Sequence, residues 1–99
     1  MHIWRPGTKA EPKSDPRVHI RLEKFNHVKR EKRYHVLRVT QTLFGDWCLE
    51  REWGQMDQAP RKERTYLPAL HEAQNEVERL KALDLKKGFA VIPVQMGLL

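Results

Sequence analysis

Apolar and polar side chains alternate along two stretches in the first half of the chain, residues 18–25 and 47–53. A period of two residues is typical of a β-strand that buries one face. Between these stretches, residues 34–42 are rich in Tyr, Val, Leu and Thr, which favour strands. Gly45 then supplies a short turn, so the second and third strands should form an antiparallel hairpin.

The third predicted strand has one face that is mostly apolar, because Trp47, Leu49 and Trp53 share it with Arg51. We expect Trp47 to lie in the core of the domain. Trp53 stands at the end of the strand, where the pattern favours neither burial nor exposure.

The hydrophobic period changes in the second half of the chain. Within residues 67–87, apolar residues recur at spacings of three and four, which indicates one apolar stripe along a helix. Pro68 suits the first turn of this helix, Lys86 and Lys87 suit its end, and Gly88 is a natural stop. The stripe consists of Leu70, Ala73, Val77, Leu80 and Leu83.

Two shorter segments complete the predicted elements. The polar residues 55–64 follow the hairpin, and their second half is a candidate edge strand; residues 89–92 are a candidate last strand. The apolar stripe of the helix must be buried, and the apolar face of the sheet is its one obvious destination. We therefore predict an α+β fold, a twisted antiparallel β-sheet with one amphipathic helix packed on it.

A chain of 99 residues fits one domain with one core. Residues 1–16 carry several prolines among scattered charges, so we expect a flexible N-terminal tail, a domain over residues 17–92 and a C-terminal tail over residues 93–99. The sequence shows neither the apolar core of a secretory signal nor a run long enough to span a membrane. We therefore expect a soluble, cytoplasmic protein.

The formal net charge is +6, and it is unevenly distributed. Residues 1–38 hold eleven Lys or Arg against four Asp or Glu, whereas residues 39–99 hold eight against nine. A one-sided basic surface suits a polyanion, because each neutralised phosphate releases condensed counterions.

The polar run after the first strand, residues 26–33, is predicted to be a basic loop. It supplies the best phosphate-binding candidates by composition, although a solvated loop that only keeps the protein soluble is an open alternative. These candidates are Lys29, Arg30, Lys32 and Arg33.

Two further arginines, Arg38 and Arg51, lie in neighbouring predicted strands and are candidates for a second basic patch. Alternatively, Arg51 pairs with a carboxylate such as Glu23 or Glu50.

No pattern in the sequence indicates catalysis. The histidines have no metal-binding spacing, Cys48 has no partner and is expected to be a small half-buried hydrophobe, and no Gly-rich phosphate loop is present. His19 and His35 are possible neighbours across two strands, and Glu50 and Glu52 look like ordinary exposed positions. We predict a protein that is not an enzyme and has no cofactor and no metal site.

The stretch from Leu43 to Gln55, which contains the tripeptide Trp53-Gly54-Gln55, resembles the core of the WGR domain, a family named for a Trp-Gly-Arg tripeptide. The preceding strand, residues 33–39, is similar to the family's preceding strand. The helix that follows ends in Lys87-Gly88-Phe89, and the family's helix also ends in a basic residue, a glycine and an aromatic residue. The resemblance covers about residues 17–92.

The resemblance implies DNA binding. WGR domains occur in poly(ADP-ribose) polymerases, where they help to recognise DNA breaks, and in stand-alone bacterial proteins. In the family, the motif Trp packs near the terminal nucleotide and basic residues hold the backbone. By position, Trp53 matches the motif Trp and Gly54 the motif Gly, whereas Gln55 replaces the motif Arg and lacks its charge.

The sequence thus predicts a non-catalytic nucleic-acid-binding module that binds DNA ends or breaks through backbone contacts and Trp stacking. Its alternative is a protein-interaction module that docks an acidic partner. No membrane partner is expected. The candidate nucleic-acid-binding residues are Trp53, Gly54, Gln55, Arg30, Arg33, Lys29, Arg38 and Arg51.

Overall fold

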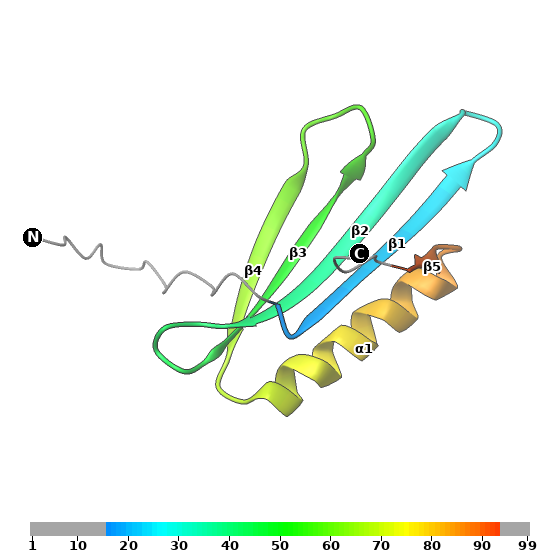
Figure 1. The fold of residues 1–99 in the computed structure, drawn as a ribbon. Coiled ribbons are helices and arrows are strands. Elements are labelled where there is room, and N and C mark those ends of the chain that lie inside the picture. Colours follow the sequence, from blue (N-terminus) through cyan, green and yellow to red (C-terminus); the bar gives the residue numbers. More distant parts are fainter. Residues whose placement is uncertain (1–15, 94–99) are drawn as a thin grey trace, which may run out of the picture.

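A computed structural model of the chain describes residues 16–93, and the predicted tails lie almost entirely outside this range. The described part is a five-stranded antiparallel sheet with one helix packed on it, which confirms the predicted α+β fold (Figure 1). The elements are β1 (Val18–Asn26), β2 (Glu31–Gln41), β3 (Trp47–Gln55), β4 (Arg61–Leu67), α1 (Leu70–Lys86) and β5 (Ala90–Ile92).

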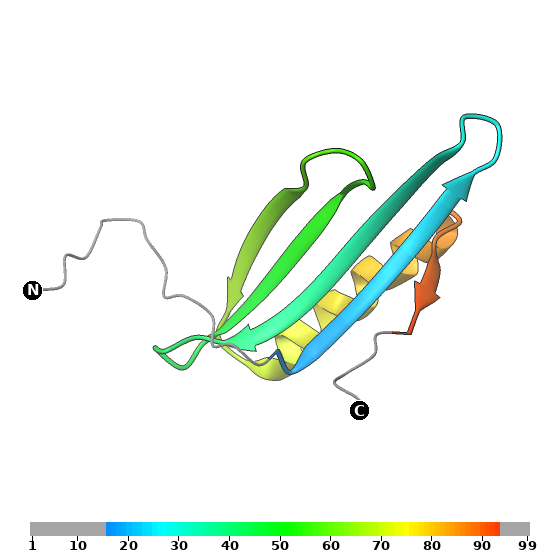
Figure 2. The same cartoon turned by 45° about the horizontal axis from the view of Figure 1, so that its top comes forward.

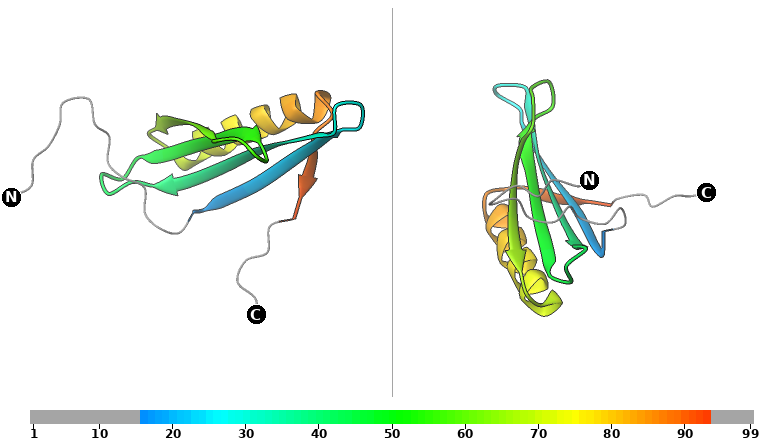
Figure 3. Two further views of the ribbon diagram at one scale, coloured as in Figure 1. Left: turned by 90° about the horizontal axis from the view of Figure 1, so that it is seen from above. Right: turned by 90° about the vertical axis from the view of Figure 1, so that its left-hand side faces the viewer.

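The first four strands form a meander, and the strand order in the sheet is β4-β3-β2-β1-β5. After β4 the chain enters α1, which crosses the sheet and returns the chain to the far edge, where β5 pairs with β1 (Figure 2). The sheet is twisted, and α1 lies on one face only (Figure 3). We call this face the helix face and the opposite one the outer face.

The core lies between α1 and the central strands. Leu22, Leu37, Val39 and Leu49 are almost fully buried on the helix face of β1, β2 and β3. Trp47 is only 9% exposed and belongs to the same cluster, as predicted. The core therefore fills the space under the first three turns of the helix.

The apolar stripe of α1 differs from the prediction at its C-terminal end. Ala73, Val77 and Leu80 are buried, but Leu83 is 41% exposed and the next buried position is Asp84, which is 5% exposed. The spacing from Leu80 to the next inward position is four residues here and not three. Both spacings are compatible with a helix face, and the packing against the sheet selects Asp84.

The start of the helix also differs from the prediction. β4 extends to Leu67, which pairs with Trp47, and the helix begins at Leu70. Pro68 therefore lies before the N-cap residue Ala69, outside the first turn, while the Glu72 side chain accepts a hydrogen bond from the Ala69 amide (3.2 Å). At the other end Gly88 has φ of 97°, which confirms it as the stop.

The predicted basic loop after the first strand is shorter than expected. β1 and β2 pair as far as Asn26 and Glu31, so only residues 27–30 form the turn. The Asn26 side chain accepts hydrogen bonds from the amides of Val28 (3.0 Å) and Lys29 (3.1 Å). Arg30 takes a left-handed conformation with φ of 55°. The hydrogen bonds of this short turn thus let the polar residues on either side of it pair as parts of β1 and β2.

The turn between β2 and β3 follows the sequence prediction. Gly45 has φ of 97°, and its amide donates to the Thr42 carbonyl (3.1 Å).

No helix among residues 16–93 has both the length and the apolar character needed to cross a membrane.

Candidate functional site

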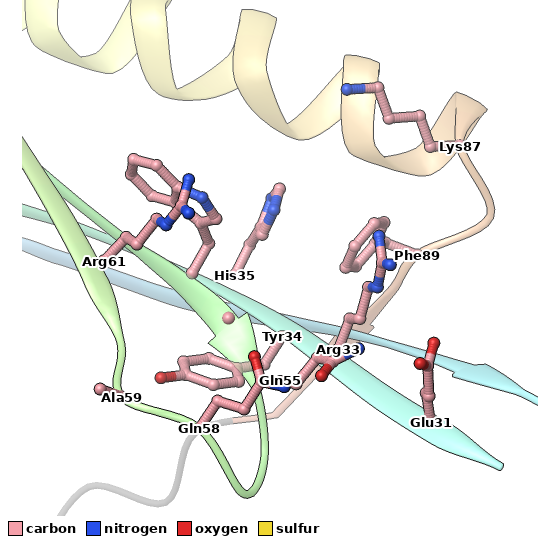
Figure 4. A pocket seen from close by; sticks show the side chains of 12 residues that line it. Glu31, Arg33, Tyr34, His35, Gln55, Gln58, Ala59, Arg61, Lys87 and Phe89 are labelled. Carbon is pink, nitrogen blue, oxygen red and sulfur yellow. The ribbon is translucent and has the colours of Figure 1, made fainter. Parts of the chain in front are cut away.

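A hollow of about 640 Å³ opens where the start of β2, the end of β3 and the start of β4 face the C-terminal end of α1 (Figure 4). It brings together four of the residues predicted from the sequence, namely Arg33, Trp53, Gly54 and Gln55. The other lining residues are Glu31, Tyr34, His35, Gln58, Ala59, Arg61, Lys87 and Phe89.

Trp53 is held by the pairing of three strands. In the sheet it lies between His35 of β2 and Arg61 of β4, and all three residues are on the helix face. Its ring is half-buried, and the guanidinium carbon of Arg51 lies 5.4 Å from the ring centroid. Trp53 is thus a partly accessible wall of the hollow, in contrast to the buried Trp47.

Three exposed cations surround the hollow and come from three different elements. Arg33 lies on β2, Arg61 begins β4, and Lys87 follows the last turn of α1. Within residues 16–93, none of the three forms an ion pair. Their charges are therefore available to an anion in the hollow.

Sequence reasoning did not find Arg61 and assigned Lys87 to the helix end. Arg61 follows Pro60 in a polar stretch without a motif, and only its pairing with Trp53 brings it to the hollow. The Lys87-Gly88-Phe89 match to the family was a signal for Lys87, because Phe89 lines the same hollow.

His35, Asp84 and Phe89 fix the end of the helix against the sheet beside the hollow. Nδ1 of His35 donates to the Asp84 carboxylate (2.7 Å), and the His35 ring stacks on Phe89 with 4.6 Å between centroids. The Asp84 carbonyl also accepts from the amides of Lys87 and Phe89, both at 3.0 Å. This cluster holds Lys87 and Phe89 in place, and it was not anticipated.

His19 and His35, which the sequence offered as possible neighbours across two strands, are not neighbours. The register pairs His35 with Leu22 and pairs His19 with Arg38, so the two histidines point to opposite faces of the sheet.

Lys29 and Arg30 lie in the turn between β1 and β2, beyond the rim of the hollow. Lys29 lines a second hollow of about 260 Å³, which also involves Arg33 and Lys87. Arg30 lines a third, of about 370 Å³, next to Gln55. The fourth candidate of this turn region, Lys32, is paired with Glu23 (3.0 Å).

Arg38 and Arg51 do not form a patch, which corrects the sequence prediction. Arg38 pairs with Glu50 in register and therefore lies on the outer face, whereas Arg51 lies on the helix face. Arg38 contacts Glu50 at 3.0 Å and Glu52 at 3.3 Å. Arg51 contacts Glu63 at 3.0 Å, and not Glu23 or Glu50. Neither arginine lines the hollow.

Glu50 and Glu52 were predicted to be ordinary exposed positions, and this was also wrong. Their side chains are 15% and 17% exposed, and Glu50 additionally accepts from Arg64 at 3.1 Å. The Tyr34 hydroxyl donates to Glu52 (3.2 Å). Cys48, on the same face of β3, is 1% exposed and so more buried than predicted.

Gly54 lines the hollow close to the backbone of the β3–β4 turn. A Cβ atom at this position would lie 3.6 Å from the Pro60 Cα and 3.8 Å from the Ala59 carbonyl oxygen. These are ordinary contact distances, so the backbone of the β3–β4 turn does approach Gly54, as expected, without requiring glycine. Gln55 is half-buried, lines the hollow and pairs in register with Arg33.

The side chains of the hollow are suited to binding an anionic ligand. It offers guanidinium and ammonium groups for an anion beside a partly accessible indole. Among residues 16–93, no group of three or more His, Cys, Asp or Glu is placed to hold a metal ion.

The family model described as the WGR domain matches residues 18–95, which is most of the chain. No curated protein and no solved structure matches the chain significantly.

Proposed function

Since the chain belongs to the WGR domain family, a non-catalytic nucleic-acid-binding module, we propose that it binds DNA ends or breaks through the hollow beside Trp53. The observation that carries this proposal is the set of cations around the half-buried indole. Arg33, Arg61 and Lys87 surround Trp53 and form no ion pair within residues 16–93.

Phosphate groups are the natural ligands of these cations. Arg33 and Arg61 each present a planar fork of donors that matches a phosphate, whereas Lys87 acts as a point charge. Because the cations come from β2, β4 and the end of α1, a bound strand contacts three elements at once. Backbone contacts of this kind position DNA without reading its sequence.

Trp53 supports a preference for ends over continuous duplex. Within a continuous duplex each base is stacked on both sides, whereas a terminal nucleotide leaves one side free. A base that stacks on an aromatic side chain contributes roughly 1–3 kcal/mol. The half-buried indole at the wall of the hollow is suited to such a terminal sugar or base.

The outer face is a poorer site because three of its arginines already have carboxylate partners. Arg38 and Arg64 contact Glu50, and Arg21 contacts Glu23 at 2.7 Å. A phosphate on this face must displace a carboxylate, so much of the counterion-release gain is absent.

The proposal is tested by titrating the protein with nicked, blunt-ended linear and closed-circular DNA of one sequence. We expect tighter binding to the nicked and linear forms. Two neighbouring residues of β4 provide a matched pair of variants, because Arg61 lines the hollow and Lys62, opposite Glu52 in register, lies on the outer face. Arg61→Gln should flatten the slope of log K against log salt by about 0.9, and Lys62→Gln should leave it near the wild-type value.

Two results oppose the proposal. Equal affinity for closed and open DNA means that ends are not recognised. Equal slopes for Arg61→Gln and Lys62→Gln mean that phosphates do not bind in the hollow. If DNA binding is absent altogether, an acidic protein partner becomes the better explanation of the same cations.

A further inference from the structure

A second hollow adjoins the hollow beside Trp53 on the side of the turn between β1 and β2. The second hollow, of about 260 Å³, shares Glu31, Arg33, Lys87 and Phe89 with the first. It adds Lys24, Asn26 and Lys29. The two hollows are adjacent, with four lining residues in common, and we call them together the extended groove.

The extended groove is cationic along its length. Arg61 lies at the Trp53 end, Arg33 and Lys87 line both hollows, and Lys29 lies at the turn end. Lys24 also lines the turn end, where its ammonium group donates to the Lys87 carbonyl (2.6 Å). Successive positive groups of this kind suit the successive phosphates of one strand, which tracks a charged groove through its backbone.

The size of the groove argues against a duplex in it. Volumes of 640 and 260 Å³ are of the size that encloses small ligands, and a nucleotide is such a ligand. A duplex presents two strands around a stacked core, so only its terminal nucleotide can reach Trp53. The second hollow is then left without a ligand, unless one strand continues past the end of the duplex.

The Glu31 carboxylate also favours a single strand over a duplex as the ligand of the extended groove. It lines both hollows and is the one carboxylate among their described lining residues. A carboxylate repels phosphate but accepts a hydrogen bond from the exocyclic amino group of a base. In a base pair that amino group is already engaged, whereas an unpaired base offers it freely.

We infer that the extended groove binds a short single-stranded extension at a DNA end. An unpaired nucleotide lies against Trp53, and the strand then passes Arg33 and Lys87 toward Lys29. The inference rests on the proposed function, because the same hollow beside Trp53 receives the end, and it specifies the form of that end.

The test uses three kinds of oligonucleotide that share one duplex. The first is a blunt-ended hairpin, the second is the same hairpin with a single-stranded extension of three nucleotides, made separately as a 5′ and a 3′ extension, and the third is a closed dumbbell without an end. We expect one of the extended hairpins to bind about tenfold more tightly than the blunt one, a ratio that corresponds to about 1.4 kcal/mol.

Lys29→Gln and Lys62→Gln are the matched variants, since both lysines are exposed and only Lys29 lines the groove. Lys29→Gln should weaken binding of the extended hairpin about threefold and leave the blunt hairpin unchanged. Lys62→Gln should change neither. A melting curve of each variant confirms that the domain is folded.

The outcomes separate this inference from the proposed function. If blunt and extended hairpins bind equally while the dumbbell binds weakly, the inference is overturned and end recognition stands. If the dumbbell matches the blunt hairpin but the extended hairpin is tighter and depends on Lys29, the inference stands and recognition of blunt ends is overturned. If Lys29→Gln affects all three DNAs equally, the second hollow has no specific role and the inference is overturned.

Discussion

Trp53 and Gln55 are two residues apart on β3, and both line the hollow. Trp53 brings a half-buried ring, and Gln55 occupies the position where the family motif has Arg. Gln55 lies opposite Arg33 across the β2–β3 ladder. A cation on the neighbouring strand therefore lies beside the position that lacks the motif charge.

Restoring the motif residue should strengthen DNA binding at a cost in stability. Gln55→Arg adds a fork-shaped cation to the hollow, so we expect affinity for a DNA end to rise by about 0.5–1.5 kcal/mol, a few-fold in Kd, with the gain lost at high salt. Because like charges directly opposite each other destabilise a sheet, the free energy of unfolding should fall by about 0.2–1 kcal/mol. DNA titration at two salt concentrations and chemical denaturation measure the two effects.

Trp53→Phe is the companion variant, since it keeps an apolar ring and reduces the stacking surface. It should weaken binding to DNA ends and leave the domain folded. If affinity is insensitive to both Trp53→Phe and Gln55→Arg, the motif surface is not the binding site in this protein.

At the scale of elements, α1 changes character along its length. Its first part packs apolar residues on the sheet, with Ala73 and Val77 at 0% and 2% exposure. Its last inward residue is Asp84, which is joined to His35 instead of to an apolar side chain. The helix is thus anchored by hydrophobic packing at one end and by a polar contact where it borders the hollow.

This arrangement predicts very different costs for two leucines of the same helix. Leu80 is 7% exposed and Leu83 is 41% exposed. Leu80→Ala should lower the free energy of unfolding by about 2–5 kcal/mol, because it leaves a cavity in the core. Leu83→Ala, the matched control, should cost under about 1 kcal/mol, because exposed substitutions have small effects and Ala favours a helix.

Urea denaturation of both variants measures the difference. Equal costs for Leu80→Ala and Leu83→Ala would mean that α1 is rotated relative to the sheet, with Leu83 turned inward as the sequence pattern predicted.

At the scale of the whole molecule, the charged side chains of the outer face and those around the hollow differ in their partners. On the outer face, hydrogen bonds from Arg21 and Lys32 lower the pKa of Glu23 below its ordinary value of 4.5. Burial by itself raises the pKa of Glu50, but the hydrogen bond from Arg64 and the charges of Arg64 and Arg38 outweigh it and lower the pKa below 4.5. Charge on this face stabilises the fold, whereas the cations around the hollow remain available for a ligand.

The outer face predicts how stability depends on pH. Burial, followed by the charges of Arg38 and Arg21, lowers the pKa of His19 below 6.5, so the unfolded chain takes up a proton there before the folded chain does. Stability should therefore be complete above pH 6.5 and decline as pH falls toward the lowered pKa of His19. A second decline should begin below pH 4.5, as Glu23 and Glu50 become protonated first in the unfolded chain.

Denaturation midpoints between pH 8 and pH 3 measure this profile. His19→Gln should remove the first decline, and Glu50→Gln should reduce the second. A first decline that persists in His19→Gln would assign it to another group.

The sequence by itself determined the elements and the main part of the core. Strand alternation, the apolar spacing up to Leu80 and the glycines at positions 45 and 88 are local signals, and the structure confirms each of them. The tripeptide Trp53-Gly54-Gln55 was also found locally, because its residues are consecutive. Periodicity and turn chemistry act over a few residues, so no knowledge of distant partners was needed.

Only the tertiary structure decided which distant residues meet. The register of the sheet separated Arg38 from Arg51 and placed Arg61 beside Trp53, because a shift of one residue moves a side chain to the other face. The rotation of α1 on the sheet turned Asp84 inward in place of Leu83. Register and rotation are fixed by packing between segments far apart in the chain, which no local pattern contains.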